Sequence, residues 1–318
     1  MPSSTASTGS NSEIESMKDL LENEEIRYVR KGYGLISAIV ITLSFYFLVP
    51  ELAYPLYLMF PYKDNQLMIA LGTFLVHLAV FTIANVTMYF IYHFEIPFFE
   101  RYKISKEPWP WYKDPQKWNK QLKQTIKVLA FNQLVLMPLL LEIPLVLGIQ
   151  PFVTDPGEFP TWKSLIPQTV FFMIVEDTLF YWGHRLFHTP AFYRRFHKWH
   201  HQYTSTIGIA SEYAHPLEFV MCNMLPSSMG PVLFGRCHIF TYWMWIVLRV
   251  CETTDGHCGY EFSWSPFRLL PFSGSSNYHN YHHSHNLGNY GSFFTYWDTI
   301  CKTNTHYWRF LAKQEKSN

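Results

Sequence analysis

The chain has 318 residues and a formal net charge of +1; 48% of its residues are hydrophobic, 19% are aromatic and 15% are charged. A soluble domain carries roughly a quarter charged residues, so this composition favours a membrane protein with a water-facing part. The near-zero net charge argues against binding to nucleic acid, which calls for a strongly basic surface.

The first 31 residues are polar and lean acidic, without the apolar segment of a cleavable signal peptide. They predict a polar cytosolic tail. The five cysteines form no C-x-x-C pair and are odd in number, which is typical of reduced, structural thiols in a cytosol-facing protein. These cysteines are Cys222, Cys237, Cys251, Cys258 and Cys301.

Four apolar segments follow in the first 182 residues. Residues 32–50 hold no charge over 19 positions, and residues 65–94 hold none over 30. A spanning helix needs about 20 such residues, so both segments qualify. Residues 128–150 and 164–182 are predicted to form a second helical hairpin, which gives four spans. A later apolar stretch, 219–248, is interrupted by Pro, Gly and Arg and is interpreted as membrane-associated or partly inserted.

Basic residues predict the orientation. Residues 101–127 carry eight Lys or Arg against two acids, and residues 184–201 carry four against none. Arg27, Arg30 and Lys31 flank the first span. With two hairpins all three regions fall on one side, which the positive-inside rule makes cytosolic. A basic loop that is merely solvated would explain any one of these regions, but not the agreement of all three.

Thirteen of the fifteen histidines follow residue 183. His184 and His188 stand at i and i+4, one helical turn apart on one face. Asp177 and Tyr181 extend this stripe toward the N-terminus, and Pro190 is expected to stop the helix.

Two further boxes repeat an i, i+3, i+4 spacing. They are His197, His200 and His201 in "HKWHH", and His279, His282 and His283 in "HNYHH". Three short helices are therefore expected to present their imidazoles to a common centre. Burying eight titratable rings without partners would be costly, so the spacing predicts a metal site.

The number of histidines indicates two ions. A catalytic zinc takes three protein ligands and a structural zinc takes four, whereas haem needs one or two axial ligands. The chain has no H-E-x-x-H motif and lacks the pair of Glu-x-x-His motifs that the soluble di-iron bundles use. Imidazole suits zinc, copper, iron and nickel alike, so the ligands leave the metal open.

Three other residues are candidates around this site. His215, in "SEYAHPLEF", and His257, in "ETTDGHCGY", would complete a coordination shell or would be hydrogen-bonded polar residues. Asp177 would accept a hydrogen bond from a ligand N–H or would face the lipid headgroups. The remaining histidines are interpreted as structural: His77, His93, His238, His285 and His306.

These motifs are recognisable. "EDTLFYWGHRLFH", "FHKWHH", "SEYAHPLEF", "DGHCGYEF" and "YHNYHHSHNLGNYGSFFTYWD" resemble the sterol C4-methyl oxidases of the fatty acid hydroxylase superfamily, from about Phe172 to Asp298. The boxes also occur in sterol C5-desaturases and fatty acid hydroxylases, whereas "EYAHPLE" and "DGHCGY" look more like the C4-methyl oxidase branch. Two departures are Asn280, where the family often has Asp, and "CKTN" at 301–304, where "GT" followed by Asp is common.

The resemblance implies a membrane-bound, non-haem di-iron oxygenase. The eight box histidines would ligate two irons, with His215 and His257 as further ligands. The enzyme would oxidise a sterol C4 methyl stepwise through alcohol and aldehyde to acid, using O₂. Electrons would come from outside the chain, because it has no Rossmann or flavin motif. The resemblance implies NAD(P)H, cytochrome b5 and its reductase as their source. Other sterol-biosynthesis enzymes are further partners in this interpretation, which places the chain in the endoplasmic reticulum membrane.

Two alternatives stay open. One keeps the di-iron site but assigns a sister-branch sterol desaturase or a lipid or fatty acid hydroxylase. The other is a non-catalytic membrane metal-binding protein, although transporters place polar ligands within their spans and these boxes lie in basic segments outside them.

The expected architecture is an all-α integral membrane protein, in which about four spans in two hairpins carry a cytosolic helical cap with a histidine-rich di-metal site. Its parts are the tail 1–31, the membrane hairpins 32–163 with the basic cytosolic linker 101–127, the fatty acid hydroxylase-like catalytic region 164–304, and a polar C-terminal tail 305–318.

Overall fold

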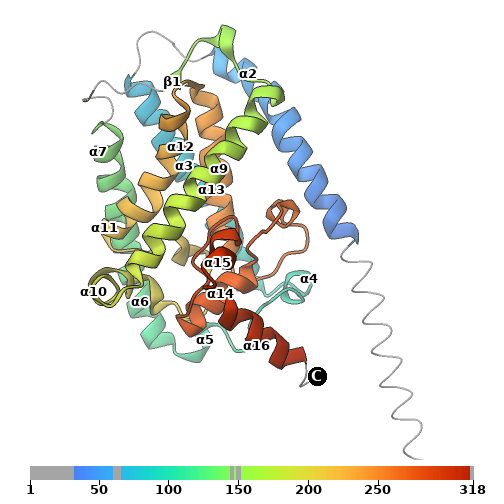
Figure 1. Cartoon of the computed structure of the whole chain (residues 1–318), viewed down its shortest axis with the longest axis vertical. Helices are drawn as coiled ribbons and strands as arrows, with labels where there is room; N and C mark the ends of the chain where they lie inside the picture. Colours follow the sequence, from blue (N-terminus) through green and yellow to red (C-terminus); the bar gives the residue numbers. More distant parts are fainter. Residues whose placement is uncertain (1–31, 60–65, 144–146, 148–151, 316–318) are drawn as a thin grey trace, which may run out of the picture.

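The computed structural model describes residues 32–59, 66–143, 147 and 152–315, so the expected N-terminal tail lies outside the described residues. Long helices pack side by side in one half of the molecule, and shorter helices and loops form the other half (Figure 1). The expectation of a predominantly helical membrane protein with a helical cap is confirmed.

Three helices in the described part of the chain are long and apolar enough to cross a membrane. They are Gly32–Leu58, which includes η1 (Ser44–Leu48) and α2 (Val49–Leu58); Ile69–Phe94, within α3 (Gln66–Phe94); and Pro115–Leu141, which joins α6 (Pro115–Phe131), η2 (Asn132–Leu136) and α7 (Met137–Leu141). The chain is therefore a membrane protein.

The fourth expected span is not confirmed. Residues 164–182 do lie in one long helix, α9 (Trp162–Phe187), but this helix is not among the candidate spans. It carries Lys163, Glu176, Asp177 and Arg185, and the two acids are fully buried. These four residues make the helix less apolar than the three candidate spans, which explains the difference.

The third span also begins earlier than expected. The basic linker 101–127 contains α5 (Pro110–Lys113) and the start of α6, after α4 (Pro97–Glu100). Asp114 caps α6 by accepting a hydrogen bond from the Lys117 amide at 3.0 Å, and Pro115 occupies the first helical position. The helix exposes lysines and buries Thr125 and Leu129, so a basic sequence continues directly into an apolar one.

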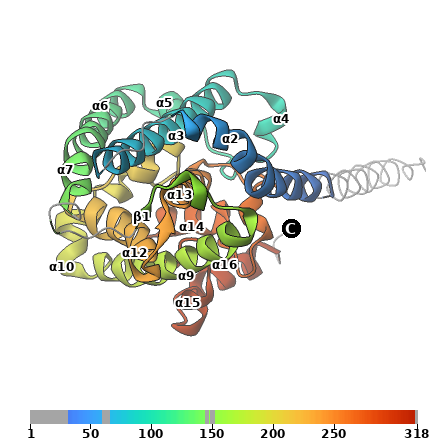
Figure 2. The ribbon, with the colours of Figure 1, turned by 90° about the horizontal axis from the view of Figure 1, so that it is seen from above.

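Helix α13 (Ile239–His257) occupies the middle of the helical bundle when the molecule is seen from above (Figure 2). It packs against α3 on one side and α9 on the other. Trp245 and Val250 of α13 join Phe172 of α9 in the largest apolar cluster. The burial of such side chains contributes about 1.5–3 kcal/mol each, and it fixes the end of α13, where His257 stands.

Short elements connect α9 and α13. They are α10 (Pro190–Phe192), η4 (Tyr193–His197), η5 (His200–Gln202), η6 (Gly208–Glu212), α11 (Pro216–Glu218), η7 (Phe219–Met224) and α12 (Leu225–Phe234). A Cβ at Gly230 would lie 2.9 Å from the Phe172 Cα, so glycine allows α12 to approach α9 closely. Strand β1 (Phe152–Val153), which precedes η3 (Pro156–Glu158), pairs in parallel with β2 (Cys237–His238).

The cap is completed by η8 (Pro266–Leu269), α14 (Ser276–His285), α15 (Tyr296–Ile300) and α16 (Thr305–Glu315). Residues 305–315 of the expected polar tail are thus helical. Tyr307 of α16 packs on Tyr278 and Tyr281 of α14, with ring centroids 5.0 and 5.2 Å apart. The C-terminal helix therefore covers the outer face of the helix that carries the third histidine box.

Candidate metal centre

Nine histidines form two groups in the interior of the cap. In each group, one nitrogen from every ring lies within 4.8 Å of the others. Group one consists of His184, His188, His197, His201 and His282. Group two consists of His200, His257, His279 and His283. The structure thus brings together all eight box histidines and adds His257.

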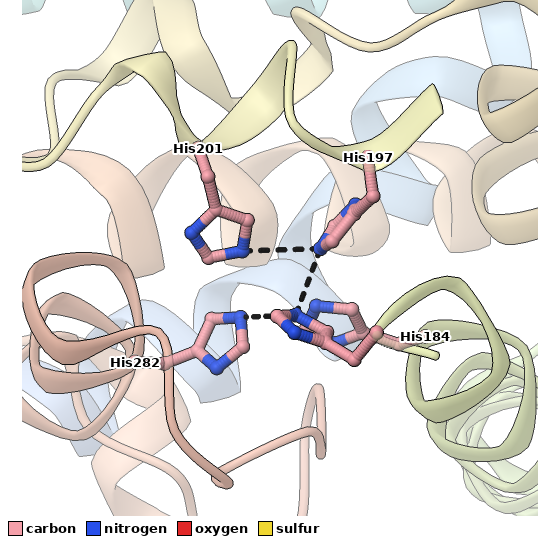
Figure 3. A group of neighbouring side chains, drawn as sticks. His184, His197, His201 and His282 are labelled. Atoms are coloured by element: carbon pink, nitrogen blue, oxygen red, sulfur yellow. Dashed lines mark hydrogen bonds between the residues drawn. The ribbon is translucent and has the colours of Figure 1, made fainter. Parts of the chain in front are cut away.

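The second and third boxes each divide between the two groups, which corrects the expectation that the histidines face a common centre. His197 and His201 join group one, whereas His200 joins group two (Figure 3 shows the group-one rings). In the third box the order is the opposite of that in the second: His279 and His283 belong to group two and His282 to group one. Successive residues of a helix point about 100° apart, so neighbouring histidines reach different groups.

The chain positions these rings by ending or bending helices at them. Helix α9 ends at Phe187, and His188 follows as its C-terminal cap. The segment around His197 is a π-helical turn followed by the 3₁₀ turn that begins at His200. Such irregular turns are frequent at functional sites because they redirect side chains.

Six of the nine rings use Nδ1 to donate a hydrogen bond to the protein. Five donate to backbone carbonyl oxygens: His184 to Tyr290 at 3.0 Å, His200 to Tyr213 at 3.2 Å, His257 to Thr253 at 2.7 Å, His282 to Gly288 at 2.5 Å and His283 to Tyr203 at 2.8 Å. The sixth, His197, donates to a carboxylate oxygen of Glu218 at 2.6 Å. These bonds fix the tautomer, so each Nε2 carries a lone pair.

These lone pairs converge. In group one the Nε2 atoms of His197 and His188 are 2.9 Å apart, and the His201 Nε2 is 3.1 Å from that of His197. In group two the His257 Nε2 lies 3.3 Å from the His200 Nε2, although both rings give their single proton to a carbonyl. Facing lone pairs repel unless a cation lies between them.

The spacing itself fits a metal ion. Two imidazole nitrogens bound at right angles to a metal about 2.1 Å away lie about 3.0 Å apart. The His184 Nε2 is buried and has no hydrogen-bond partner among the described residues, as expected of a nitrogen that needs a metal. The donor set in both groups consists of neutral imidazoles, which suit zinc, copper, iron and nickel.

Burial keeps these rings uncharged. It lowers the pKa of His200 to about 4 and, with the neighbouring His200 ring, the pKa of His282 to about 3. Burial also lowers the pKa of His283 well below its ordinary value. At neutral pH the rings are therefore free of protons at the nitrogens that would bind metal, and protons do not compete for them.

Glu218 is the residue that sequence reasoning missed. It lies in α11, is 4% exposed, and binds the His197 Nδ1 through one carboxylate oxygen while the other has no partner among the described residues. A carboxylate in this position orients the ring and raises its basicity. The sequence offers one indication of this role, the position of Glu218 three residues after His215 in "HPLE". The same pattern is equally typical of the start of a helix.

Asp177 has a different role from the one expected. Its Oδ1 accepts hydrogen bonds from the backbone amides of Ser292 and Phe294, at 3.2 and 3.0 Å, and no bond to a ligand ring is seen among the described residues. Asp298 similarly accepts from the Tyr290 and Gly291 amides, at 2.9 and 2.8 Å. The two carboxylates hold the loop whose carbonyls orient His184 and His282.

His215 lies outside both groups. Its Nδ1 accepts a hydrogen bond from the Leu217 amide at 3.2 Å, and its ring packs 4.9 Å from the rings of Phe196 and Trp199. It is thus the N-terminal cap of α11. Asn280, one of the two departures, accepts from the Thr206 amide and hydroxyl and ties α14 to the segment after the second box.

Comparison with known proteins places this site in a family. Residues 169–303, which contain all nine histidines, Glu218 and Asp177, match the model of the fatty acid hydroxylase family. The chain is 34% identical to methylsterol monooxygenase 2-2 of Arabidopsis thaliana over 270 residues, covering 82% of this chain and 95% of the relative.

Other relatives carry different names. A very-long-chain aldehyde decarbonylase of Oryza sativa subsp. indica is also 34% identical, over 82% of this chain and 93% of its own length. A putative methylsterol monooxygenase of Dictyostelium discoideum is 36% identical, over 76% and 87% of the two chains. No solved structure matches the chain.

Proposed function

The chain belongs to the fatty acid hydroxylase superfamily, and from that premise we propose that it oxidises a C4 methyl group of a sterol at a centre of two iron ions. It is an oxidoreductase that resembles the methylsterol monooxygenases. The family is one of non-haem iron enzymes, and the two histidine groups supply the ligands that such a centre needs.

The observation that carries the proposal is the convergence of histidine Nε2 atoms in two adjacent groups. His184, His188, His197, His201 and His282 would hold one ion, and His200, His257, His279 and His283 the other. A saturated C–H bond has no acidic proton and no leaving group, so its oxidation requires a metal that activates O₂. The protein's own part is to hold neutral ligands, fix their tautomers and keep the centre buried.

The sterol assignment rests on the names of the relatives and on the motifs "EYAHPLE" and "DGHCGY". Methylsterol monooxygenases occur among the relatives from both Arabidopsis and Dictyostelium. A second candidate is a reaction on very-long-chain aldehydes, because the Oryza sativa relatives of that name are as similar in sequence. A membrane-bound lipid is the substrate in both cases.

Electrons would be supplied from NAD(P)H by cytochrome b5 and its reductase, with the site facing the cytosol at the endoplasmic reticulum. Exposed cations on α6 and around the second box support this part of the proposal: Lys117, Lys120, Lys123, Lys127, Arg194, Arg195 and Lys198. Such a surface attracts an acidic electron donor and speeds its association.

The test uses membranes that contain the chain, NADH, cytochrome b5 and its reductase. Three substrates are supplied separately: a 4,4-dimethyl sterol, a Δ7 sterol without C4 methyls, and a very-long-chain aldehyde. We expect oxygen to be added to a C4 methyl group of the first substrate alone. Loss of two hydrogens from the second, or shortening of the third to a hydrocarbon, would contradict the methyl oxidase assignment in favour of a sister activity.

A further inference from the structure

A cavity of about 50 Å³ lies between α3, α7, η6, α12 and α13. Its inner wall is formed by buried polar residues, namely His77, Glu212, Arg249 and Thr253. Its rim includes half-buried residues of α7, η7 and α12, namely Leu141, Asn223, Met224 and Ser228. The cavity therefore leads from a partly exposed, mainly apolar rim to a buried polar end.

Three elements meet at that polar end. The His77 Nε2 of α3 lies 2.9 Å from the Glu212 Oε1 of η6, and the Gln133 Nε2 of η2 donates to the Glu212 Oε2 at 2.7 Å. All three side chains are buried, and His77 is 8% exposed. His77 stands inside a candidate membrane span, where a polar residue usually marks a functional site.

Glu212 fixes the tautomer of His77. Although burial raises the pKa of Glu212, the His77 ring and the hydrogen bonds from His77 and Gln133 bring it below the ordinary value, so the carboxylate is charged. A carboxylate only accepts hydrogen bonds, so the His77 Nε2 must donate. With Nε2 as the donor, Nδ1 is the ring nitrogen left to accept, and it is buried with no partner among the described residues.

An unsatisfied buried acceptor costs roughly 1–3 kcal/mol, so this nitrogen calls for a donor. The surroundings restrict what that donor is. Both Glu212 oxygens are occupied, and Arg249 is already paired with Glu176 and Glu252, at 2.7 and 2.8 Å. The charged side chains of this cavity are thus already paired and would not bind a carboxylate, phosphate or ammonium group. The ligand that fits best is an apolar molecule with a neutral hydroxyl group.

We propose that this cavity binds the hydroxyl end of the lipid substrate, with the His77 Nδ1 accepting a hydrogen bond from it. Glu212 and Gln133 are positioning residues that act through His77. The inference rests on the proposed function and sharpens it, because a sterol carries a hydroxyl group and an aldehyde carries none.

The position of the cavity relative to group two fits this assignment. Thr253, on the cavity wall, accepts the Nδ1–H of His257, and Tyr213, the residue after Glu212, accepts that of His200. The polar end of the cavity is thus linked through the backbone to two ligands of one ion. In a sterol, C4 is bonded to the carbon that carries the hydroxyl, so anchoring the hydroxyl here would bring C4 toward the metal centre.

Binding to the iron-loaded protein in detergent, without a reductant, tests the inference without turnover. The probes are a 4,4-dimethyl sterol with its free 3-hydroxyl and the 3-O-methyl ether of the same sterol, which cannot donate. We expect the wild type to bind the alcohol about 3- to 10-fold more tightly, the effect of one neutral hydrogen bond. In His77→Phe, which keeps a ring but removes the acceptor, the ratio should fall to about one.

The matched control is His93→Phe, the same change on the same helix at an exposed residue, which should leave the ratio as in the wild type. A second variant, Glu212→Gln, offers an N–H to the His77 Nε2 and thereby turns Nδ1 into a donor. The preference for the alcohol should then disappear or reverse. If Glu212 had a purely structural role, the affinity for both probes would fall equally.

Two results would overturn the inference: equal affinity of the wild type for the two probes, or an unchanged ratio in His77→Phe because only water fills the cavity. Failure of the proposed function would look different. If the wild type prefers hydroxylated lipids through His77 but oxidises no sterol at C4, the cavity assignment stands and the reaction assignment falls. If it oxidises C4 methyls without this preference, the reaction assignment stands and the cavity assignment falls.

Discussion

The two histidine groups are built differently although they lie side by side. Group one has five rings, drawn from α9, the second box and α14, and one of them, His197, is bound to the buried carboxylate of Glu218. Group two has four rings, and three of them are oriented by backbone carbonyls alone. One of the four, His257, comes from the central helix α13, next to the proposed substrate cavity.

This difference suggests different roles for the two ions. An ion in group one would have more protein ligands, so it is the more enclosed of the two. An ion in group two would keep more coordination positions free, on the side where the cavity ends. Catalytic metal sites keep such open positions, so group two is where the substrate is expected to react.

The largest expected effect comes from removing a ligand of either group. His200→Ala in group two and His282→Ala in group one should each reduce turnover by more than about 100-fold, which exceeds the usual effect of losing only a partner of a ligand. The iron content of the purified variants, measured by mass spectrometry, should fall as well. Retained turnover in His200→Ala would contradict its assignment as a ligand.

A smaller loss is expected from Glu218, which distinguishes group one. Glu218→Gln keeps the side-chain shape but replaces the carboxyl group that binds the His197 Nδ1, so metal affinity should fall about 10- to 100-fold. The measurement is a titration of iron into the metal-free protein. If the affinity of both ions falls equally, the two groups do not differ in the way described here.

Removing the metal should lower stability, because the converging Nε2 lone pairs then face one another. Chelation is expected to lower the midpoint of thermal unfolding on the order of 5 °C, and added Fe²⁺ should restore it. Circular dichroism at increasing temperature provides the readout. An unchanged midpoint would mean that the protein forms these groups without needing a cation.

A moderate effect is expected from Asp177, which acts on the loop rather than on a ligand. Asp177→Ala leaves the Ser292 and Phe294 amides without their acceptor and should cost about 1–3 kcal/mol of stability. Thermal unfolding of the metal-bound protein measures it. A loss of iron without any loss of stability would instead support the role first expected for this residue, that of a direct partner of a ligand.

The smallest effect is expected from His215→Ala. This histidine only caps the short helix α11, and replacing a cap costs about 0.5–2 kcal/mol. Iron content and turnover should stay close to those of the wild type. The variant is therefore the matched control for His200→Ala, since both change one histidine of the same region to alanine, and a loss of iron in both would contradict the separation of the two.

The sequence predicts the spans well where apolar residues are continuous, as in 65–94, because hydrophobic length alone decides the matter there. The fourth predicted span, in α9, is not confirmed; there Glu176 and Asp177 interrupt the apolar run and are accommodated by partners from distant segments. Arg249 and the amides of Ser292 and Phe294 lie more than 70 residues away along the chain. The hydropathy of a short stretch of sequence does not reveal such distant partners.

At the metal centre, spacing identifies the eight box histidines but not their division between two groups. A helical pattern shows that His200 and His201 point in different directions, but only the tertiary fold shows what each one meets. His215 and His257 look alike in sequence, since each stands in a polar stretch. The packing of α13 into the middle of the bundle brings His257 to group two. His215 instead caps the short helix α11, which lies outside both groups.

The central claim is that the nine histidines hold two ions. The most direct test is the number of iron atoms bound per chain in the purified, iron-loaded wild type, determined by metal analysis against protein concentration. We expect two irons per chain, falling in His257→Ala but not in His215→Ala. One iron or none in the wild type, or an equal effect of the two substitutions, would contradict the account.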